Sequence, residues 1–186
     1  MPLGRGVRLP ITVLFADIRG FTSLAERHEP QDVVRFLNEY IGIATPILLK
    51  HDGCIDKLLG DSIMAVFGAP IVQPDHVGQA VAAAVELQDA LAGIQTLGGS
   101  LRVGVGLHTG EAVVANVGDI HVRDFTAIGD TVNVASRVQE LAKPGEVLAT
   151  AQVYESVARD YPQAPSWQAQ LDGRSQPVTV YRLRAG

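Results

Sequence analysis

Hydrophobic and polar residues alternate along the chain with two periods, one typical of helices and one typical of strands. After Pro30 the apolar residues recur every three to four positions, and the alanine-rich segment 75–94 has the same period. Pro46 is expected to kink the first of these helices, and Gly53 is expected to end it. The predicted helices are a short one capped by Thr22 or Ser23, and the segments 30–53, 75–94, 131–142 and 153–158.

Short apolar or alternating runs between these helices predict the strands. They lie at 11–16, 54–59, 63–67, 101–117, 147–149 and 178–183. The second and third strands flank Gly60-Asp61-Ser62, which favours a hairpin, and the fourth is expected to be interrupted at His108-Thr109-Gly110. This order of elements predicts an α/β sandwich of ferredoxin-like or palm-like type, in which helices cover one face of a mostly antiparallel sheet.

Composition narrows the class of protein. The 186 residues, 47% of them hydrophobic and 19% charged, suit one domain at 9–186 preceded by a tail or linker at 1–8. A net charge of -5 argues against nucleic acid as the main partner, and the single Cys54 excludes an intrachain disulfide. No apolar run approaches the roughly 20 residues that span a bilayer, and no signal peptide begins the chain. We therefore expect a cytoplasmic domain, which could belong to a longer, membrane-associated protein.

Two aspartates stand where a metal site would need them. Asp17 follows the buried run 11–16, and Asp61 lies in the tight turn between two strands. Hairpin and central strands are neighbours in the predicted architecture, so both carboxylates could converge at one edge of the sheet. A carboxylate pair binds Mg²⁺ or Mn²⁺ together with substrate phosphates. The structural alternative is that Asp17 caps a helix and that Asp61 is an ordinary turn residue.

The segment after Asp17 has the features of an anion-binding turn. Gly20 permits a tight turn, and the main-chain N–H groups of Gly20, Phe21 and Thr22 would be free at the start of a helix. The motif G-x-x-x-x-G-K-[ST] is absent from the chain, which disfavours a P-loop nucleotidase. Gly104-Val105-Gly106 is a weak glycine pattern, which we interpret as packing.

A polar pair lies on the helix predicted at 131–142. Asn133 and Arg137 are four residues apart and so project from one face. The intervening Val134, Ala135 and Val138 can face the core. An amide beside a guanidinium suits a ribose and a phosphoryl oxygen whose negative charge rises in a transition state. On most helix surfaces, however, an Asn and an Arg are simply solvated.

Four stretches follow one another along the chain: FADIRGFTSL, KLLGDSIMAVFG, GVGLHTGEAVVANVG and FTAIGDTVNVASR. In this order and spacing they resemble the catalytic domain of class III nucleotidyl cyclases, the adenylate/guanylate cyclase family, over roughly 9–183. The resemblance implies that Asp17, Asp61 and the main-chain carbonyl of Ile18 bind two divalent cations, Mg²⁺ or Mn²⁺. One ion would lower the pKa of the ribose 3′-hydroxyl, and the other would hold the triphosphate.

The resemblance also implies the substrate contacts. Asn133 would orient the ribose, and Arg137 would stabilise charge on the α-phosphate. Lys57 and Thr126 would select the purine, because a lysine donor and a threonine acceptor match N1 and the 6-amino group of adenine, whereas guanine presents the reverse pattern. The implied activity is an adenylate cyclase that converts ATP to cyclic AMP and pyrophosphate in cyclic-nucleotide signalling.

Two departures from the family pattern carry expectations of their own. Many members have aspartate where this chain has Thr126, and threonine there resembles a subgroup described as responsive to bicarbonate or CO₂. Near the C-terminus the family commonly has a lysine that contacts the triphosphate, and Asp172 occupies that position here. Arg174 is the candidate to replace this lysine.

The family further implies a head-to-tail homodimer with shared active sites. The metal-binding aspartates would come from one chain, and the residues that bind the base, the ribose and the α-phosphate from the other. The segment 117–125, with His121 and Arg123, would reach the partner chain, or would be an exposed polar hairpin. Three alternatives remain: a catalytically silent cyclase-like module for dimerisation or sensing, a guanylate cyclase, and a diguanylate cyclase, which the turn 59–62 disfavours.

Overall fold

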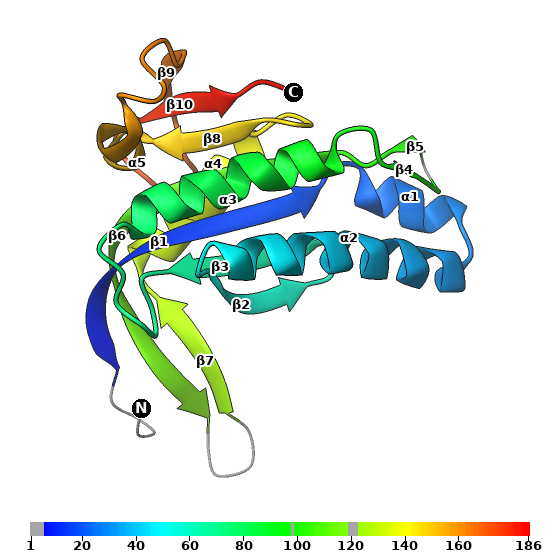
Figure 1. Cartoon of the computed structure of the whole chain (residues 1–186), viewed down its shortest axis with the longest axis horizontal. Coiled ribbons are helices and arrows are strands. Elements are labelled where there is room, and N and C mark those ends of the chain that lie inside the picture. Colours follow the sequence, from blue (N-terminus) through cyan, green and yellow to red (C-terminus); the bar gives the residue numbers. More distant parts are fainter. Residues whose placement is uncertain (1–5, 98, 119–122) are drawn as a thin grey trace.

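A mixed sheet of eight strands forms the centre of the protein (Figure 1). The computed structural model describes residues 6–97, 99–118 and 123–186. In sheet order the strands are β2 (Cys54–Leu59), β3 (Ser62–Phe67), β1 (Val7–Ile18), β6 (Val103–Gly118), β8 (Val147–Thr150), β10 (Val178–Arg184) and β9 (Ser166–Ala169), and β7 (Arg123–Ile128) pairs with β6. The strand pairs are antiparallel except for β6 with β8, which confirms the predicted mostly antiparallel sheet.

Five helices are present in the described residues. They are α1 (Phe21–Arg27), α2 (Pro30–Lys50), α3 (His76–Leu91), α4 (Asp130–Leu141) and α5 (Ala151–Val157). Each corresponds to a predicted helix, although α2 continues through Pro46 and ends before Gly53. The side chain of Asp75 caps α3 by accepting a hydrogen bond from Gly78 N at 3.2 Å. In the part of the chain that the structure describes, no helix is long and apolar enough to cross a bilayer.

Helices cover both faces of the sheet, whereas the sequence predicted one covered face. Along β1, Leu14 and Ala16 face the core shared with α2, α3 and α5, while Val13 and Phe15 face the opposite side. The second face packs against α4, whose Ala135 belongs to the same cluster as Val13. The apolar run in β1 is continuous because a central strand covered on both sides needs apolar residues at successive positions.

Strand β6 runs without a break through His108 and Gly110, where an interruption was predicted. Thr109 lies opposite Thr12 on β1, and their hydroxyl oxygens are 3.1 Å apart. Gly110 lies beneath the start of α4, since a Cβ at this position would be 2.8 Å from Thr131 Oγ1. The polar residues and the glycine therefore serve contacts across the sheet, and they do not end the strand.

Four strands were not predicted. They are β7, β9 and the two-residue strands β4 (Gln95–Thr96) and β5 (Gly99–Ser100). Figure 1 shows β7 and the end of β6 projecting from the body of the molecule as a hairpin arm. The expected dimer segment 117–125 falls on this arm: Arg123 pairs with Gly118 in the β6–β7 ladder, and His121 lies outside the described residues.

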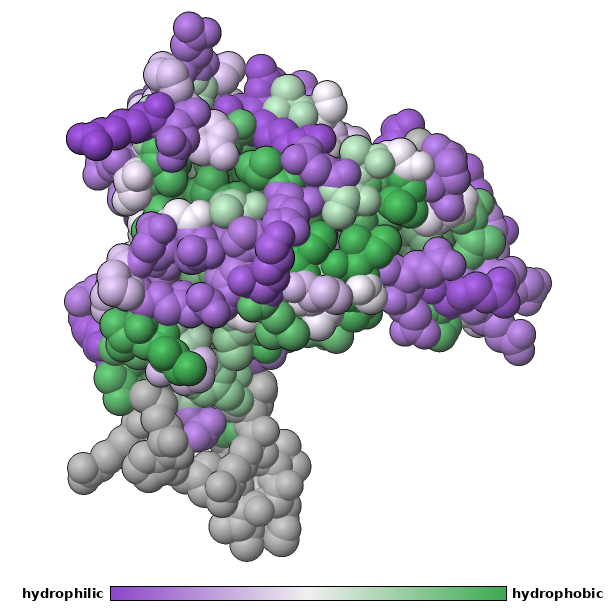
Figure 2. All heavy atoms as spheres, viewed as in Figure 1, coloured by the Kyte–Doolittle hydropathy of each residue, from purple (hydrophilic) through white to green (hydrophobic). Residues whose placement is uncertain are grey.

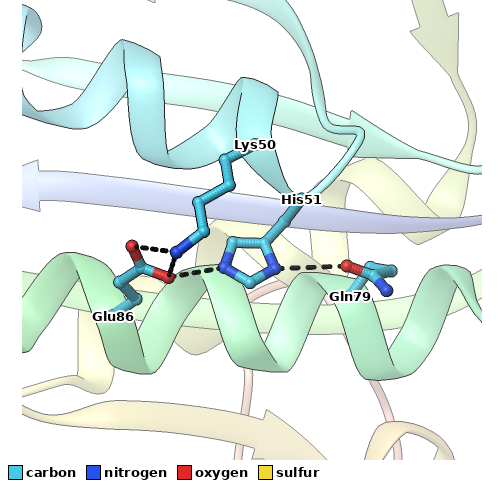
Figure 3. Close-up of polar contacts among 4 residues, drawn as sticks. All are labelled: Lys50, His51, Gln79 and Glu86. Atoms are coloured by element: carbon cyan, nitrogen blue, oxygen red, sulfur yellow. Dashed lines mark hydrogen bonds and ion pairs between the residues drawn. The ribbon is translucent and has the colours of Figure 1, made fainter.

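A polar network fixes the end of α2 to α3 (Figure 3). Lys50 Nζ donates to the two carboxylate oxygens of Glu86 at 2.8 and 2.9 Å. The imidazole of His51 lies between two acceptors, with Nε2 2.7 Å from Glu86 Oε2 and Nδ1 3.1 Å from Gln79 Oε1. The network lies at the surface, where polar side chains cover much of the visible face of the molecule (Figure 2).

Candidate active site

The two predicted metal ligands meet at one end of β1. Asp17 pairs with Ser62 in the β1–β3 ladder, and Ile18 N donates to the main-chain oxygen of Asp61 at 3.4 Å. This register brings the carboxyl groups of Asp17 and Asp61 within hydrogen-bond reach of each other. Burial, then the hydrogen bond to Asp61 and its negative charge, raise the pKa of Asp17 to about 7. The site thus concentrates carboxylate oxygens where a cation would relieve the repulsion.

The donor set fits a hard divalent cation. Asp17 Oδ1 is buried and has no hydrogen-bond partner among the described residues. Among the residues that the structure describes, no group of three or more His, Cys, Asp or Glu side chains is placed so that it could hold a metal ion. A cation bound by Asp17 and Asp61 would therefore complete its shell with oxygens of other kinds, such as the Ile18 carbonyl and substrate phosphates.

Two residues next to Asp17 were missed by the sequence reasoning. The positive charge of Arg19 and a hydrogen bond from Gln139 of α4 lower the pKa of Asp17, but less than burial and Asp61 raise it. The Arg19 guanidinium also donates to the main-chain oxygen of Gln139. Glycines make this approach feasible: a Cβ at Gly104 would overlap Arg19, and one at Gly106 would overlap the backbone of Gln139. The packing interpretation of the glycine pair is confirmed.

The turn after Asp17 has the backbone that the sequence predicted. Gly20 has a φ of 76°, in the left-handed region that favours glycine, and it directly precedes α1. Leu24 N donates to Gly20 O at 3.1 Å, so this is the first helical bond, and the N–H groups of Phe21 and Thr22 have no acceptor within the helix. Stacking of Phe21 on Phe36, with ring centroids 6.5 Å apart, holds α1 against α2. Phosphate binding by this turn stays a prediction.

The two residues predicted to select the purine are in contact. Lys57 on β2 donates from Nζ to Thr126 Oγ1 on β7 at 3.0 Å. Lys57 Nζ also donates to Asp56 Oδ1 at 2.9 Å, and Asp56 Oδ2 accepts from Ala127 N at 2.9 Å. The sequence reasoning missed Asp56, because neighbouring residues on a regular strand point to opposite faces.

Asn133 and Arg137 lie on the outer side of α4, and Val134 and Val138 are buried beneath them, as predicted. Within one chain, Asn133 lies apart from the Gln139 side chain that contacts Asp17. Asn133 is exposed, and it precedes the buried Gln139 by six residues, which is about 9 Å along a helix axis. The carboxylates and Asn133 therefore lie at different positions along α4.

Arg174 lies beside the first turn of α4. Its Nη1 is 2.6 Å from Asp130 Oδ2, and the neighbouring Asp172 is exposed. Gly173 lies close to Arg137, because a Cβ at Gly173 would be 3.3 Å from the Arg137 guanidinium. The structure thus brings Arg174 near the helix that carries Arg137, and its contact with a triphosphate stays a prediction.

Comparison with known proteins gives the family of the chain. The family described as "Adenylate and Guanylate cyclase catalytic domain" matches residues 8–185. Adenylate cyclase 1 of Rhizobium meliloti is 34% identical over 183 residues, which are 95% of this chain and 28% of that protein. An adenylate cyclase of Anabaena cylindrica is 35% identical over 191 residues, with 94% of this chain and 37% of that protein covered. The chain therefore spans less than two fifths of the length of these relatives.

Solved structures agree with the sequence comparison. The guanylyl cyclase Cya2 superposes with a TM-score of 0.89 and 34% identity, over 97% of this chain and 94% of that one. The adenylyl cyclase CyaB from P. aeruginosa gives a TM-score of 0.85 and 31% identity, over 98% and 96% of the two chains. The resemblance drawn from the four sequence stretches is confirmed, and the chain belongs to the family of adenylate and guanylate cyclase catalytic domains.

Proposed function

We propose that this nucleotide cyclase domain is an adenylate cyclase, which converts ATP to 3′,5′-cyclic AMP and pyrophosphate. The supporting observation is the contact of 3.0 Å between Lys57 Nζ and Thr126 Oγ1. An ammonium donor beside a hydroxyl acceptor complements N1 and the 6-amino group of adenine, whereas guanine presents a donor at N1 and an acceptor at C6. Because similar proteins include adenylate and guanylyl cyclases, the proposed preference for ATP rests on this contact.

The acidic end of β1 is the proposed metal site. Asp17, Asp61 and the Ile18 carbonyl would hold two divalent cations, Mg²⁺ or Mn²⁺, which when bound lower the pKa of the ribose 3′-hydroxyl and neutralise the triphosphate. The β1–β3 register holds the two carboxylates together, and Gln139 supports Asp17 from α4. These contacts fix the carboxylates before substrate arrives, which reduces the reorganisation that binding requires.

The remaining groups would bind and orient the nucleotide. In the reaction the 3′ oxygen bonds to the α-phosphorus, its proton leaves, and the bond from phosphorus to pyrophosphate breaks. Asn133 would orient the ribose, and Arg137 would donate to an α-phosphate oxygen as negative charge develops there. The N–H groups of residues 20–22 would bind the phosphates. Arg174, now bonded to Asp130, would have to exchange that carboxylate for a phosphate.

We propose that the complete site forms between two chains in a head-to-tail homodimer. In one chain the carboxylates of Asp17 and Asp61 lie at the end of the sheet, while Asn133 projects from the exposed side of α4. A second copy can supply Lys57, Asn133 and their neighbours to the first copy's carboxylates. The same arrangement, repeated by symmetry, gives two equivalent sites.

Context and regulation are further parts of the proposal. The relatives are much longer than this chain, which supports a domain tethered to others in a longer, cytoplasmic or membrane-associated protein that signals through cyclic AMP. Threonine at position 126 supports bicarbonate or CO₂ as an effector. The silent-module alternative is disfavoured because Asp17, Asp61, Asn133 and Arg137 are all present.

The deciding experiment incubates the purified domain with ATP or GTP and Mn²⁺ or Mg²⁺, and measures cyclic nucleotide over a range of protein concentrations. We expect cyclic AMP from ATP, with a specific activity that rises with concentration as the dimer forms. Formation of cyclic GMP from GTP at an equal or higher kcat/KM would overturn the ATP assignment. No product from either nucleotide would favour the silent module, and activity with and without bicarbonate tests the effector.

A further inference from the structure

Strand β2 has an irregularity directly before Lys57. In the β2–β3 ladder Ile55 pairs with Ala65, and the next pair is Lys57 with Met64. Asp56 is therefore an extra residue on β2 with no partner of its own on β3, which is a β-bulge. Neighbouring side chains on a regular strand point to opposite faces, and a bulge can re-aim one of them. This accounts for the finding that Asp56 and Lys57 both reach β7.

Asp56 is buried and bonded on both oxygens. Its side chain has 0% exposure, yet Oδ1 accepts from Lys57 Nζ and Oδ2 accepts from Ala127 N, each at 2.9 Å. A buried carboxylate is costly unless it is paired with a charge and hydrogen-bonded, and Asp56 has both. Lys57 also donates to Thr126. Asp56 is therefore bonded to Lys57, one of the two purine-selecting residues, and to Ala127, which directly follows the other, Thr126.

We propose that Asp56 is a positioning residue that sets the purine preference of this domain through Lys57 and Thr126. The inference rests on the proposed function of that pair. The charged bond to Asp56 holds the Lys57 ammonium against β7. The bond to Ala127 N fixes the β7 backbone so that the Thr126 hydroxyl faces the ammonium. The flexible Lys57 side chain and the Thr126 hydroxyl are thereby held in one arrangement before a base arrives.

Asp56 also disfavours a site that binds guanine. A guanine site needs an acceptor for the N1 proton, and a carboxylate at position 57 would supply that acceptor. A carboxylate there would lie beside the buried Asp56 and would remove its cationic partner. Like charges at this distance repel, and an unpaired buried carboxylate is destabilising. The chain therefore accepts a carboxylate at position 57 only when Asp56 is made neutral as well.

The first test compares Asp56→Asn with Glu155→Gln, the same kind of change at an exposed position of α5. An amide offers one acceptor and one donor where the carboxylate faced two donors, so one of the two bonds is lost with the shape retained. We expect Asp56→Asn to lower kcat/KM for ATP about tenfold and to reduce the ratio of ATP to GTP use by a similar factor. Glu155→Gln should keep both values. An unchanged ratio in a cooperatively melting Asp56→Asn variant overturns the proposal.

The second test introduces Lys57→Glu with and without Asp56→Asn. The single variant is expected to melt at a lower temperature than the wild type and to use both nucleotides poorly. The double variant should recover melting temperature and use GTP at least about tenfold better than the single variant, because its position 56 carries no charge. Equal melting temperatures and equal GTP use in the two variants contradict the inference.

A stability cycle separates this inference from the proposed function. A wild type that makes no cyclic AMP would end the adenylate cyclase proposal, whereas the Asp56–Lys57 pairing can be measured by urea unfolding without any activity. Lys57→Met leaves the buried carboxylate unpaired, so adding Asp56→Asn to it should restore stability. Additive destabilisation by the two changes shows that the residues are not coupled, and the inference then fails.

Discussion

The carboxyl groups of Asp17 and Asp61 lie within hydrogen-bond reach of each other at the end of β1, and Asp17 Oδ1 is buried without a partner in the described ranges. Two acidic groups held this close oppose folding unless a proton or a cation lies between them. Mg²⁺ or Mn²⁺ is therefore expected to raise the melting temperature of the wild type. The gain is about 2.7 kcal/mol when the metal is at 100 times its Kd.

Asp61→Asn tests this relationship without any assay of activity. The variant should be at least as stable as the wild type in the absence of metal, because the repulsion is removed, and it should lose the metal-dependent rise in melting temperature. Asp160→Asn, at an exposed position after α5, is the matched control and should retain that rise. A full metal response in Asp61→Asn would show that the pair is not the metal site.

Complementation tests the proposed division of the site between chains. Asp17→Ala and Arg137→Ala should each abolish activity, because one removes a metal ligand and the other the group that stabilises the transition state. Mixing the two variants should restore activity up to about a quarter of the wild-type value, since half of the dimers are mixed and each has one intact site. The measurement is cyclic AMP formed at a fixed total protein concentration.

The control for complementation is the oligomeric state. Both variants and their mixture should sediment as dimers at the assay concentration. A mixture that stays inactive although mixed dimers form would mean that Asp17 and Arg137 act within one chain, and the shared-site arrangement would be wrong.

Protonation of His108 is expected to lower stability at acidic pH. His108 Nδ1 lies 2.8 Å from Thr150 Oγ1, and burial, aided by Arg174 and opposed by Asp130, lowers the pKa of His108 to about 4. The unfolded chain has a histidine pKa near 6.5 and so binds the proton first as pH falls. Stability from this residue is therefore complete above pH 6.5 and decreases toward pH 4, by roughly 3 kcal/mol at most.

Urea unfolding at several pH values measures this effect. His108→Gln keeps a group that can bond Thr150 but does not titrate, so its free energy of unfolding should fall less between pH 6.5 and pH 4 than that of the wild type. His28→Gln, in the segment between α1 and α2, should keep the wild-type dependence. The same dependence in His108→Gln as in the wild type would contradict the prediction.

The proximity of Asp17 and Asp61 could be predicted because each is an unusual residue at a recognisable place in the chain. Asp17 ends a buried strand, Asp61 occupies a tight turn, and the four sequence stretches fix their order along the chain. The residues around them were missed where the signal is tertiary. Gln139 has the sequence context of an ordinary polar helix residue. Only the fold shows that its side chain contacts Asp17 and that its backbone lies against Gly106.

Local periodicity also misled the prediction of the sheet. The segment 123–128, RDFTAI, shows no clean alternation of polar and apolar residues, and so β7 was not predicted. Thr109 and Gly110 look like a turn signal, yet they serve contacts with β1 and α4. The bulge at Asp56 inverts the side-chain direction, which no two-residue period can predict.

The contact of Gly106 with α4 gives a prediction that links packing to the site. Gly106→Ala should destabilise the domain by about 2 kcal/mol, because a Cβ would overlap the backbone of Gln139 and would push α4 from the sheet. Gly42→Ala is the matched control, since Gly42 is exposed within α2 and a Cβ there meets nothing within 4 Å. It should stabilise the domain by about 0.5–1 kcal/mol, because alanine favours helix.

Displacing Gln139 also removes its bond to Asp17, so Gly106→Ala should weaken the metal-dependent rise in melting temperature while Gly42→Ala preserves it. If Gly106→Ala folds with wild-type stability and an unchanged metal response, then α4 does not hold Asp17 in place.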